Sequence, residues 1–494
     1  MRRTFLMIGC LLSVSVAVMG QRVLSLDSCR AMALQDNKQL AAARLGQDLA
    51  RDVRKAARTK YMPKIDALGG YSYMSKEVSI LNDDQKSNLR NMGTNAVNTL
   101  ATTNIGTQLT QILTGLGINP AQVLPAAVAP INNVGADIVD AFRTDTRSMW
   151  AGTVQLRQPL YLGGAIMAAN KMAKIGERMA DSKIEHQTQE TIYDIDKAYW
   201  LVVSLRQKQR LAESYRDLVA KLDKDVHKMI GEGVATRADG LKVDVKVNEA
   251  DMQITQVENG LSLSRMLLCQ LCGMPLDTEF VLEDEASDGN LNIQDSELKI
   301  EGDASSSSET SLRPELNLLE NAVELSRQTE KLALAPYLPH VGLIGGYTFS
   351  NPNVMNGFEQ KVGGLWNVGV MIHVPVWNWM EGKFKVRAAR TATAIARLTL
   401  DETREKIDLQ VSQSRFKVTE AYKKLERARK NIESADENLR CANAGFREGV
   451  MDATTVMQAQ TAWQQAQTQR IDAEIDVHMA EATLSKALGT LRVN

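Results

Sequence analysis

Residues 165–230 are a very long helix-forming stretch, with no proline and a single glycine, Gly176. A continuous helix of this length measures about 100 Å at 1.5 Å per residue. Helices of globular proteins usually run about 10–14 residues, so one this long must pack laterally over its whole length. Its second half has the seven-residue repeat of a coiled-coil seam. The repeated apolar residues are Leu205, Ala212, Val219 and Val226, flanked by Leu201, Tyr215, Leu222 and Met229.

A second seam follows a break at Gly231, Glu232 and Gly233. Its residues are Val243, Val247, Ala250, Ile254, Val257, Leu261, Ser264, Leu268 and Leu271. Together the two seams predict a long helical hairpin over residues 165–272, with its tip at residues 231–236.

The chain repeats itself at two constant offsets. A shift of 276 residues aligns Tyr61 with Tyr337, Pro63 with Pro339, and Gly69 and Gly70 with Gly345 and Gly346. A shift of 216 residues aligns Trp150 with Trp366, Pro159 with Pro375, Gly233 with Gly449, and Gly273 with Gly489. The first half therefore holds about 60 residues more than the second, in an insert at residues 74–149.

These repeats predict a mainly α fold with two β-strands in each half. The first repeat (21–273) contains a helix at 26–60, strands at 65–73 and 150–160 around the insert, and the hairpin at 165–272. The second repeat (312–494) contains a helix at 312–335, strands at 341–349 and 366–376, and a hairpin at 383–488. Its last helix carries an alanine column, which lets helices approach closely: Ala459, Ala466, Ala473, Ala480 and Ala487.

Between the repeats, residues 274–311 are rich in Asp, Glu and Ser and predict a solvated acidic linker. Cys29 and Cys441 stand alone in the sequence, whereas Cys269 and Cys272 form a C-x-x-C near a helix end. With no second pair and no histidine at ligand spacing, the favoured interpretation is small buried helix residues. A metal or redox role is the alternative.

Residues 1–20 predict an export signal peptide. Arg2 and Arg3 precede an apolar run at residues 5–18, and small residues precede Gln21. The alternative is a lipoprotein signal ending at Cys10, which would leave an apolar tail on the mature protein.

The alternation of apolar and polar residues along the predicted strands is the main sequence evidence for function. In residues 366–376, one face holds Val368, Val370, Ile372 and Val374, and the other holds Asn367, Gly369, Met371 and His373. This is the alternation that a tilted membrane strand needs. Four strands cannot close a barrel, and an open edge in lipid leaves backbone groups unpaired, so closure requires several chains. The alternative is a small soluble β-domain with one buried face. Four prolines are expected at strand–helix junctions: Pro63, Pro159, Pro339 and Pro375.

This layout resembles the TolC-type outer-membrane efflux proteins, the outer membrane factors. The resemblance rests on the twofold repeat, on Q-P-L-Y-L-G-G at residues 158–164, and on the spacing from Gly233 to Asp239 at the first tip. It implies a homotrimeric duct in which four strands per chain form a shared 12-stranded barrel in outer-membrane lipid. A long α-helical coiled-coil barrel would extend that duct into the periplasm, with the acidic linker at residues 274–311 in its equatorial region. The implied partners are a periplasmic adaptor (membrane fusion) protein and an inner-membrane pump of the RND, ABC or MFS type.

By position, the resemblance implies adaptor docking at the two tips, through Gly231, Gly233, Val234, Arg447, Gly449 and Val450. The alternative is that the glycines only end helices. A periplasmic constriction is implied at Asp239, Asp452, Thr455 and Gln458. In this sequence Thr455 and Gln458 stand where some family members have acidic residues, so only Asp239 keeps its match. The insert follows a strand that should exit at the cell surface, which predicts an extracellular cap.

The function implied is a passive exit duct for small molecules that a separate pump drives. An exit duct of a type I protein secretion system and a non-pore periplasmic coiled-coil scaffold are the alternatives. An enzyme is not expected, because the five histidines (His186, His227, His340, His373 and His478) show no metal or triad spacing. No cofactor is expected, and a formal charge of −1 gives no reason to expect nucleic-acid binding.

Overall fold

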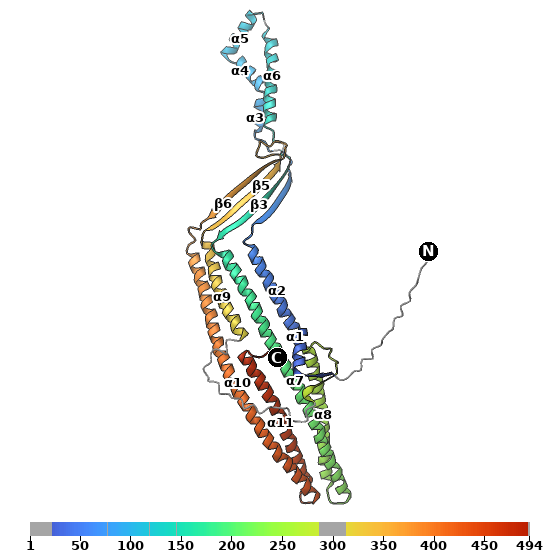
Figure 1. The fold of residues 1–494 in the computed structure, drawn as a ribbon. Helices are drawn as coiled ribbons and strands as arrows, with labels where there is room; N and C mark the ends of the chain where they lie inside the picture. Colours follow the sequence, from blue (N-terminus) through green and yellow to red (C-terminus); the bar gives the residue numbers. More distant parts are fainter. Residues whose placement is uncertain (1–21, 77, 118, 145, 286–312, 493–494) are drawn as a thin grey trace, which may run out of the picture. The chain divides into compact units, whose positions relative to one another are not determined.

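The structure is a computed structural model that describes residues 22–76, 78–117, 119–144, 146–285 and 313–492. It divides into two compact units. Unit 1 comprises residues 1–55, 171–330 and 387–494, and unit 2 comprises residues 56–170 and 331–386 (Figure 1). The expected signal peptide and residues 286–311 of the expected linker lie outside the described residues. Within the described ranges, no helix has the length and apolarity needed to cross a bilayer.

Long helices confirm the predicted duplication. Helices α7 (Ala165–Gly231) and α10 (Glu381–Arg447) are each 67 residues long. Their hairpin partners α8 (Arg237–Leu271) and α11 (Ala453–Leu488) have 35 and 36 residues. Helix α9 (Pro314–Leu334) opens the second repeat.

The predicted seam residues are buried or half-buried within unit 1, except Leu201, which is 42% exposed. Val219 and Val226 of α7 pack in one apolar cluster with Val243 and Ala250 of α8. The same cluster contains Leu439 and Phe446 of α10 and Val456 and Ala459 of α11. The two hairpins therefore share a core near their tips. Lateral packing of this kind is what stabilises helices of such length.

The helix predicted at residues 26–60 is two helices, α1 (Leu26–Asp36) and α2 (Lys38–Thr59). Asn37 interrupts it with an extended backbone (ψ 121°). Its side-chain oxygen accepts hydrogen bonds from the backbone N–H groups of Gln39 and Leu40, at 2.8 and 3.1 Å. Asparagine competes with the helix for local hydrogen bonds in this way. Ser25 is the N-cap of α1.

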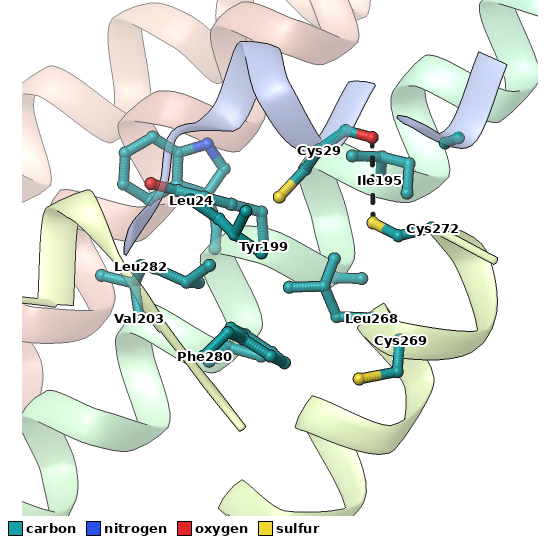
Figure 2. Close-up of a cluster of buried hydrophobic side chains, with 14 of the residues drawn as sticks. Leu24, Cys29, Ile195, Tyr199, Val203, Leu268, Cys269, Cys272, Phe280 and Leu282 are labelled. Carbon is teal, nitrogen blue, oxygen red and sulfur yellow. Dashed lines mark hydrogen bonds between the residues drawn. The ribbon is translucent and has the colours of Figure 1, made fainter. Parts of the chain in front are cut away.

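The start of the predicted solvated linker is folded into a core instead. Strand β4 (Phe280–Leu282) pairs in parallel with β1 (Arg22–Leu24), an element that the sequence analysis did not predict. Phe280 and Leu282 are buried beside Tyr199 of α7 (Figure 2). The Tyr199 hydroxyl donates to the Asp284 carboxylate at 2.6 Å, and the buried Glu285 accepts from Arg265 at 3.0 Å. The short 3-10 helix η1 (Glu283–Glu285) follows β4.

Cys29 does not stand alone. The Cys272 thiol lies 3.8 Å from the carbonyl oxygen of Cys29, and both residues are buried in the same cluster as Cys269 (Figure 2). The prediction that Cys269 and Cys272 are small buried residues at a helix end is confirmed, with Cys272 as the C-cap of α8.

Unit 2 contains a four-stranded antiparallel sheet in the order β2-β3-β5-β6. Its strands are β2 (Lys64–Tyr73), β3 (Ser148–Leu162), β5 (His340–Asn351) and β6 (Gly363–His373). All four were predicted, with ends within a few residues. Val374, expected on the apolar face of the last strand, lies just beyond its end.

The insert between β2 and β3 is helical, which its Asn-, Gly- and Thr-rich sequence did not indicate. It contains α3 (Asp83–Arg90), α4 (Met92–Ala101), α5 (Asn104–Gly115) and α6 (Pro120–Ala141). Side-chain caps and close glycine contacts hold these helices. Asn82 makes a capping box with Gln85, and a Cβ at Gly93 would lie 2.6 Å from the Val128 oxygen.

Candidate functional site

The sheet of unit 2 has one apolar face and one polar face, as its register shows. Ile65 of β2 pairs with Leu156 of β3, and Val154 pairs with Tyr347 of β5, which pairs with Trp366 of β6. Paired residues in a sheet point to the same side. The apolar face is therefore formed by Ile65, Ala67, Tyr71, Tyr73, Trp150, Val154, Leu156, Val341, Leu343, Tyr347, Phe349, Trp366, Val368, Val370 and Ile372.

The opposite face holds the polar and charged side chains of the sheet, together with a few apolar ones: Leu68, Ile344, Leu365 and Met371. Arg157 makes an ion pair with Asp66 across the β2–β3 ladder, and the hydroxyls of Thr153 and Thr348 lie 3.1 Å apart. Asn367 and His373 belong to this polar face. In β3 the register places Val154 and Leu156 on the apolar side and Thr153, Gln155 and Arg157 on the polar side.

Aromatic residues lie near both ends of the sheet, in the strands at one end and in the loop after β6 at the other. At the end that carries the insert, Trp150 and Phe349 pack edge to face with ring centroids 5.8 Å apart, close to Tyr347. At the opposite end, Trp377 and Trp379 are exposed and pack edge to face at 5.9 Å. Aromatic rows at the two limits of an apolar band are typical of membrane–water interfaces.

The sheet has two free edges. Among the described residues, β2 pairs only with β3 and β6 pairs only with β5. Both edge strands are ten residues or longer and carry apolar side chains on one face. Long unpaired edges of this kind are templates for pairing with a strand of another chain.

Three of the four prolines lie at strand–helix junctions as predicted. Pro63 and Pro339 directly precede β2 and β5, and Pro375 follows the end of β6. Pro159 lies inside β3 instead, next to a register shift between Pro159 and Tyr161. Because β2 ends opposite Arg157, β3 has a partner on one side only at this point, where a missing N–H is tolerated.

Both hairpin tips have the same backbone geometry. Gly233 and Gly449 adopt positive φ values of 74° and 71°. The N–H of Val234 donates to the Met229 oxygen at 2.9 Å, and the N–H of Val450 donates to the Gly445 oxygen at 2.8 Å. This is the Schellman arrangement that ends a helix, and it requires glycine. Gly231 and Arg447 are the last residues of α7 and α10.

Each tip also exposes one aliphatic side chain. Val234 is 70% exposed and Val450 is 81% exposed. Both follow the glycine at equivalent positions of the two repeats, so the two tips present matching apolar points.

Residues of the predicted constriction cap the helices that follow the tips. Asp239 forms a capping box with Thr236, whose hydroxyl lies 2.6 Å from its carboxylate, and Lys242 lies 3.2 Å away. Hydrogen bonds from Thr236 and Lys242 lower the pKa of Asp239, so it carries a charge. Asp452 is the N-cap of α11 and accepts from the N–H and hydroxyl of Thr455 at 2.9 and 2.6 Å. Gln458 is exposed one turn further along α11.

Behind the first tip lies a group that the sequence analysis did not identify. Asp223 and His227 of α7 and Asp244 of α8 bring their ligand atoms within 4.8 Å of one another. Asp223 lies 3.1 Å from Nδ1 of His227 and Asp244 lies 3.8 Å from Nε2. A hydrogen bond to the Asp223 backbone oxygen, with the two carboxylates, raises the pKa of His227. Because the carboxylates face different ring nitrogens, the group suits a protonated histidine better than a metal ion. No sequence pattern indicated this group, because Asp244 lies on a different helix from Asp223 and His227.

Residues 306–490 match the family described as "Outer membrane efflux protein". No curated protein matches the chain by sequence. The fold is similar to that of VceC from Vibrio cholerae (TM-score 0.69, 13% identity, covering 94% of this chain and 96% of that chain). It is also similar to the CmeC outer membrane channel of Campylobacter jejuni (TM-score 0.70, 14% identity, covering 94% and 85%). The open-state MtrE outer membrane channel of Neisseria gonorrhoeae gives a TM-score of 0.66 at 15% identity, covering 94% and 91%. The expectation of a TolC-type fold is confirmed.

Proposed function

We propose that this chain, a TolC-type outer-membrane efflux protein by its fold and by the family match of its second repeat, is the exit duct of a tripartite efflux system. In this proposal an inner-membrane pump supplies small molecules, a periplasmic adaptor joins pump and duct, and the duct conducts passively. The two-faced sheet with two free edges carries the proposal.

Closure of the wall follows from those edges. A membrane strand with unpaired N–H and C=O groups in lipid loses several kcal/mol per group. If β6 of one copy pairs with β2 of the next, three copies close a barrel of twelve strands, an allowed even number. The apolar face would then contact lipid, and the Arg157–Asp66 face would line water.

The long helices would extend this wall into the periplasm. Four long helices per chain, two of about 100 Å, give twelve in a trimer. Their seams are sealed by the buried Val, Leu and Ala residues described above, which leaves the tips as the far end of the duct.

We infer that the tips are the adaptor-docking surface. Exposed aliphatic side chains at Val234 and Val450, each held by a rigid glycine turn, offer small apolar contacts in a charged surrounding. Asp239 would lie near the mouth, where three symmetry copies add their negative charges. Asp239 also caps α8, and Lys242 partly offsets the charge of the Asp239 carboxylate.

Conductance tests the duct directly. The full chain, purified from outer membranes in detergent, is expected to give discrete conductance steps in a planar lipid bilayer. In a strain that lacks its outer-membrane exit duct, a cognate pump and adaptor should confer drug tolerance only with this chain present. A protein that is extracted without detergent and never conducts would support the periplasmic scaffold and overturn the proposal.

A further inference from the structure

The four helices α3–α6, residues 83–141, form a cap on one end of the sheet (Figure 1). The register places Tyr73 opposite Ser148, and Ser350 opposite Gly363, at this end. The strands connect to the long helices at their other end, through Lys64, Leu162, His340 and His373. In the proposed duct the cap therefore lies outside the cell, at the outer mouth.

A short paired neck fastens the cap to the sheet. The N–H of Met74 donates to the Arg147 oxygen at 2.8 Å, and the N–H of Val78 donates to the buried Thr146 hydroxyl at 2.6 Å. Within the cap, Asn132 of α6 accepts from the N–H of Gly93 at 2.7 Å and so caps α4. The last of these contacts holds α4 against α6.

Helix α5 has little support from its own chain. Of its twelve residues only Gly106 is buried and only Leu113 is half-buried. Thr110 faces a cavity of about 480 Å³ that α4 and α6 also line. An isolated helix of this length is marginal in water, so α5 needs a further packing partner.

One side of α5 is an apolar stripe with the i, i+4, i+7, i+11 spacing of a helix face. Ile105, Leu109, Ile112 and Leu116 are 67%, 38%, 59% and 69% exposed. A contiguous exposed stripe of this kind marks an interaction surface.

Most of the cap is free of charge, because its charged residues lie only in α3 and near the C-terminal end of α6: Asp83, Asp84, Lys86, Arg90, Asp137 and Asp140. Residues 91–136 contain no Asp, Glu, Lys, Arg or His. Solvated protein surfaces usually carry about 25–35% charged residues. A neutral surface gives no charge complementarity to a foreign partner, and it avoids the like-charge repulsion that identical copies would otherwise experience.

We propose that the α5 stripe (Ile105, Leu109, Ile112 and Leu116) is a contact between copies of this chain, through which three caps associate into a helical lid over the outer mouth. The inference rests on the proposed trimer. The cap follows β2, a free edge that must pair with the neighbouring copy, so the cap stands beside the seam between copies. Closure of the barrel brings the three stripes to a high effective concentration with no further partner.

Cross-linking tests the contact. In a Cys441→Ser background the remaining cysteines of the mature chain, Cys29, Cys269 and Cys272, are buried. Ile112→Cys, at an exposed position, should then be joined between copies by a short bismaleimide in intact membranes. Thr114→Cys lies on the opposite side of the same helix and is the matched control, for which loss of cross-linking is expected.

The outcomes separate the two proposals. Trimers that carry Ile112→Cys and give no linked chains, or no more than the Thr114→Cys trimers, would overturn the lid and leave the duct intact. A protein that is not a trimer would overturn the duct and the lid together.

Charge on the stripe gives a second readout. Ile112→Glu should open the lid and raise the single-channel conductance, while Thr114→Glu should leave it unchanged. Equal conductance of both variants in assembled trimers would show that the stripes do not meet over the mouth, and would overturn the lid.

Discussion

Two adjacent residues at the middle of β6 test which face of the sheet contacts lipid. Val368 belongs to the apolar face and Asn367 to the polar face. An arginine at the bilayer midplane of a membrane strand costs about 2–4 kcal/mol, whereas a lumen-facing arginine stays hydrated.

We therefore expect Val368→Arg to reduce the amount of protein assembled in the outer membrane, and Asn367→Arg to assemble as the wild type does. Heat-modifiable migration on gels of outer-membrane fractions measures assembly. The opposite order would reverse the two faces, and equal assembly of both variants would argue against a lipid-facing sheet.

The salt bridge between His186 and Glu315 makes stability depend on pH. The two residues lie 3.4 Å apart, and Arg313 binds Glu315 at 3.0 and 3.1 Å. Burial opposes ionisation of Glu315, but the hydrogen bond from His186, with Arg313, lowers its pKa to about 2 from an ordinary 4.5. The hydrogen bond to Glu315 raises the pKa of His186.

The directions of these two pKa shifts define the pH range in which the salt bridge stabilises the folded protein. The stability that ionised Glu315 adds to the folded protein is complete above about pH 4.5 and is lost as pH falls toward 2. The stability that protonated His186 adds is complete below about pH 6.5 and is lost as pH rises through the raised pKa of His186 in the folded protein. The Tm deficit of Glu315→Gln should therefore be largest near pH 5–6, smaller but present at pH 8 because Arg313 remains, and absent near pH 2. A pH-independent deficit in thermal scans would contradict this assignment.

Asp239 provides a test of the mouth at the residue scale. Asp239→Asn keeps a side-chain oxygen for the capping box and removes the charge. We expect weaker block of conductance by multivalent cations, because three carboxylates around one axis attract them. Asp251→Asn, further along α8, removes a charge paired with Arg216 and is the control. Unchanged block in Asp239→Asn would assign Asp239 to capping alone.

At the scale of elements, the long helices and four strands could be predicted because their signals are repeated over many residues. The heptads of α7 and α8 and the alternation of β6 each involve eight or more positions, and the duplication shows most of them twice. Elements held by a few contacts were missed. Asn37 breaks a helix through two hydrogen bonds, and β1 and β4 are three residues each.

The helical insert was missed for a different reason. Its helices contain many residues of low helix propensity, such as Asn, Thr, Gly and Pro, and close approaches at Gly93, Gly106 and Gly135 hold them together. Tertiary contacts of this kind leave no periodic signal. The duplication gives no help, because the second repeat has only a short loop between β5 and β6.

The two tips act as equivalent elements, and they can be tested together. The double variant Val234→Glu with Val450→Glu should abolish drug tolerance, because a charged group replaces the exposed apolar contact offered to the adaptor. The isosteric pair Val234→Thr with Val450→Thr is the control and should retain most tolerance.

Outer-membrane trimers and conductance should persist in both double variants, because neither valine packs in the core. Full tolerance in the glutamate variant would remove the docking assignment. Loss of trimers would instead give these residues a role in folding.

At the scale of the whole molecule, the tip glycines and the pairing of equivalent prolines were predictable because the sequence repeats them. The placement of Pro159 inside β3 and of Cys29 against Cys272 was not, since both depend on register or on contacts between distant segments. The same holds for the assembly. One chain presents a sheet with two open edges, and only other copies can close it.

The number of chains in the membrane-extracted protein tests that claim most directly. Native mass spectrometry of the full-length protein, released from outer membranes in detergent, should give a mass of three chains. A single folded chain that keeps its β-strands and remains soluble without detergent would contradict the account.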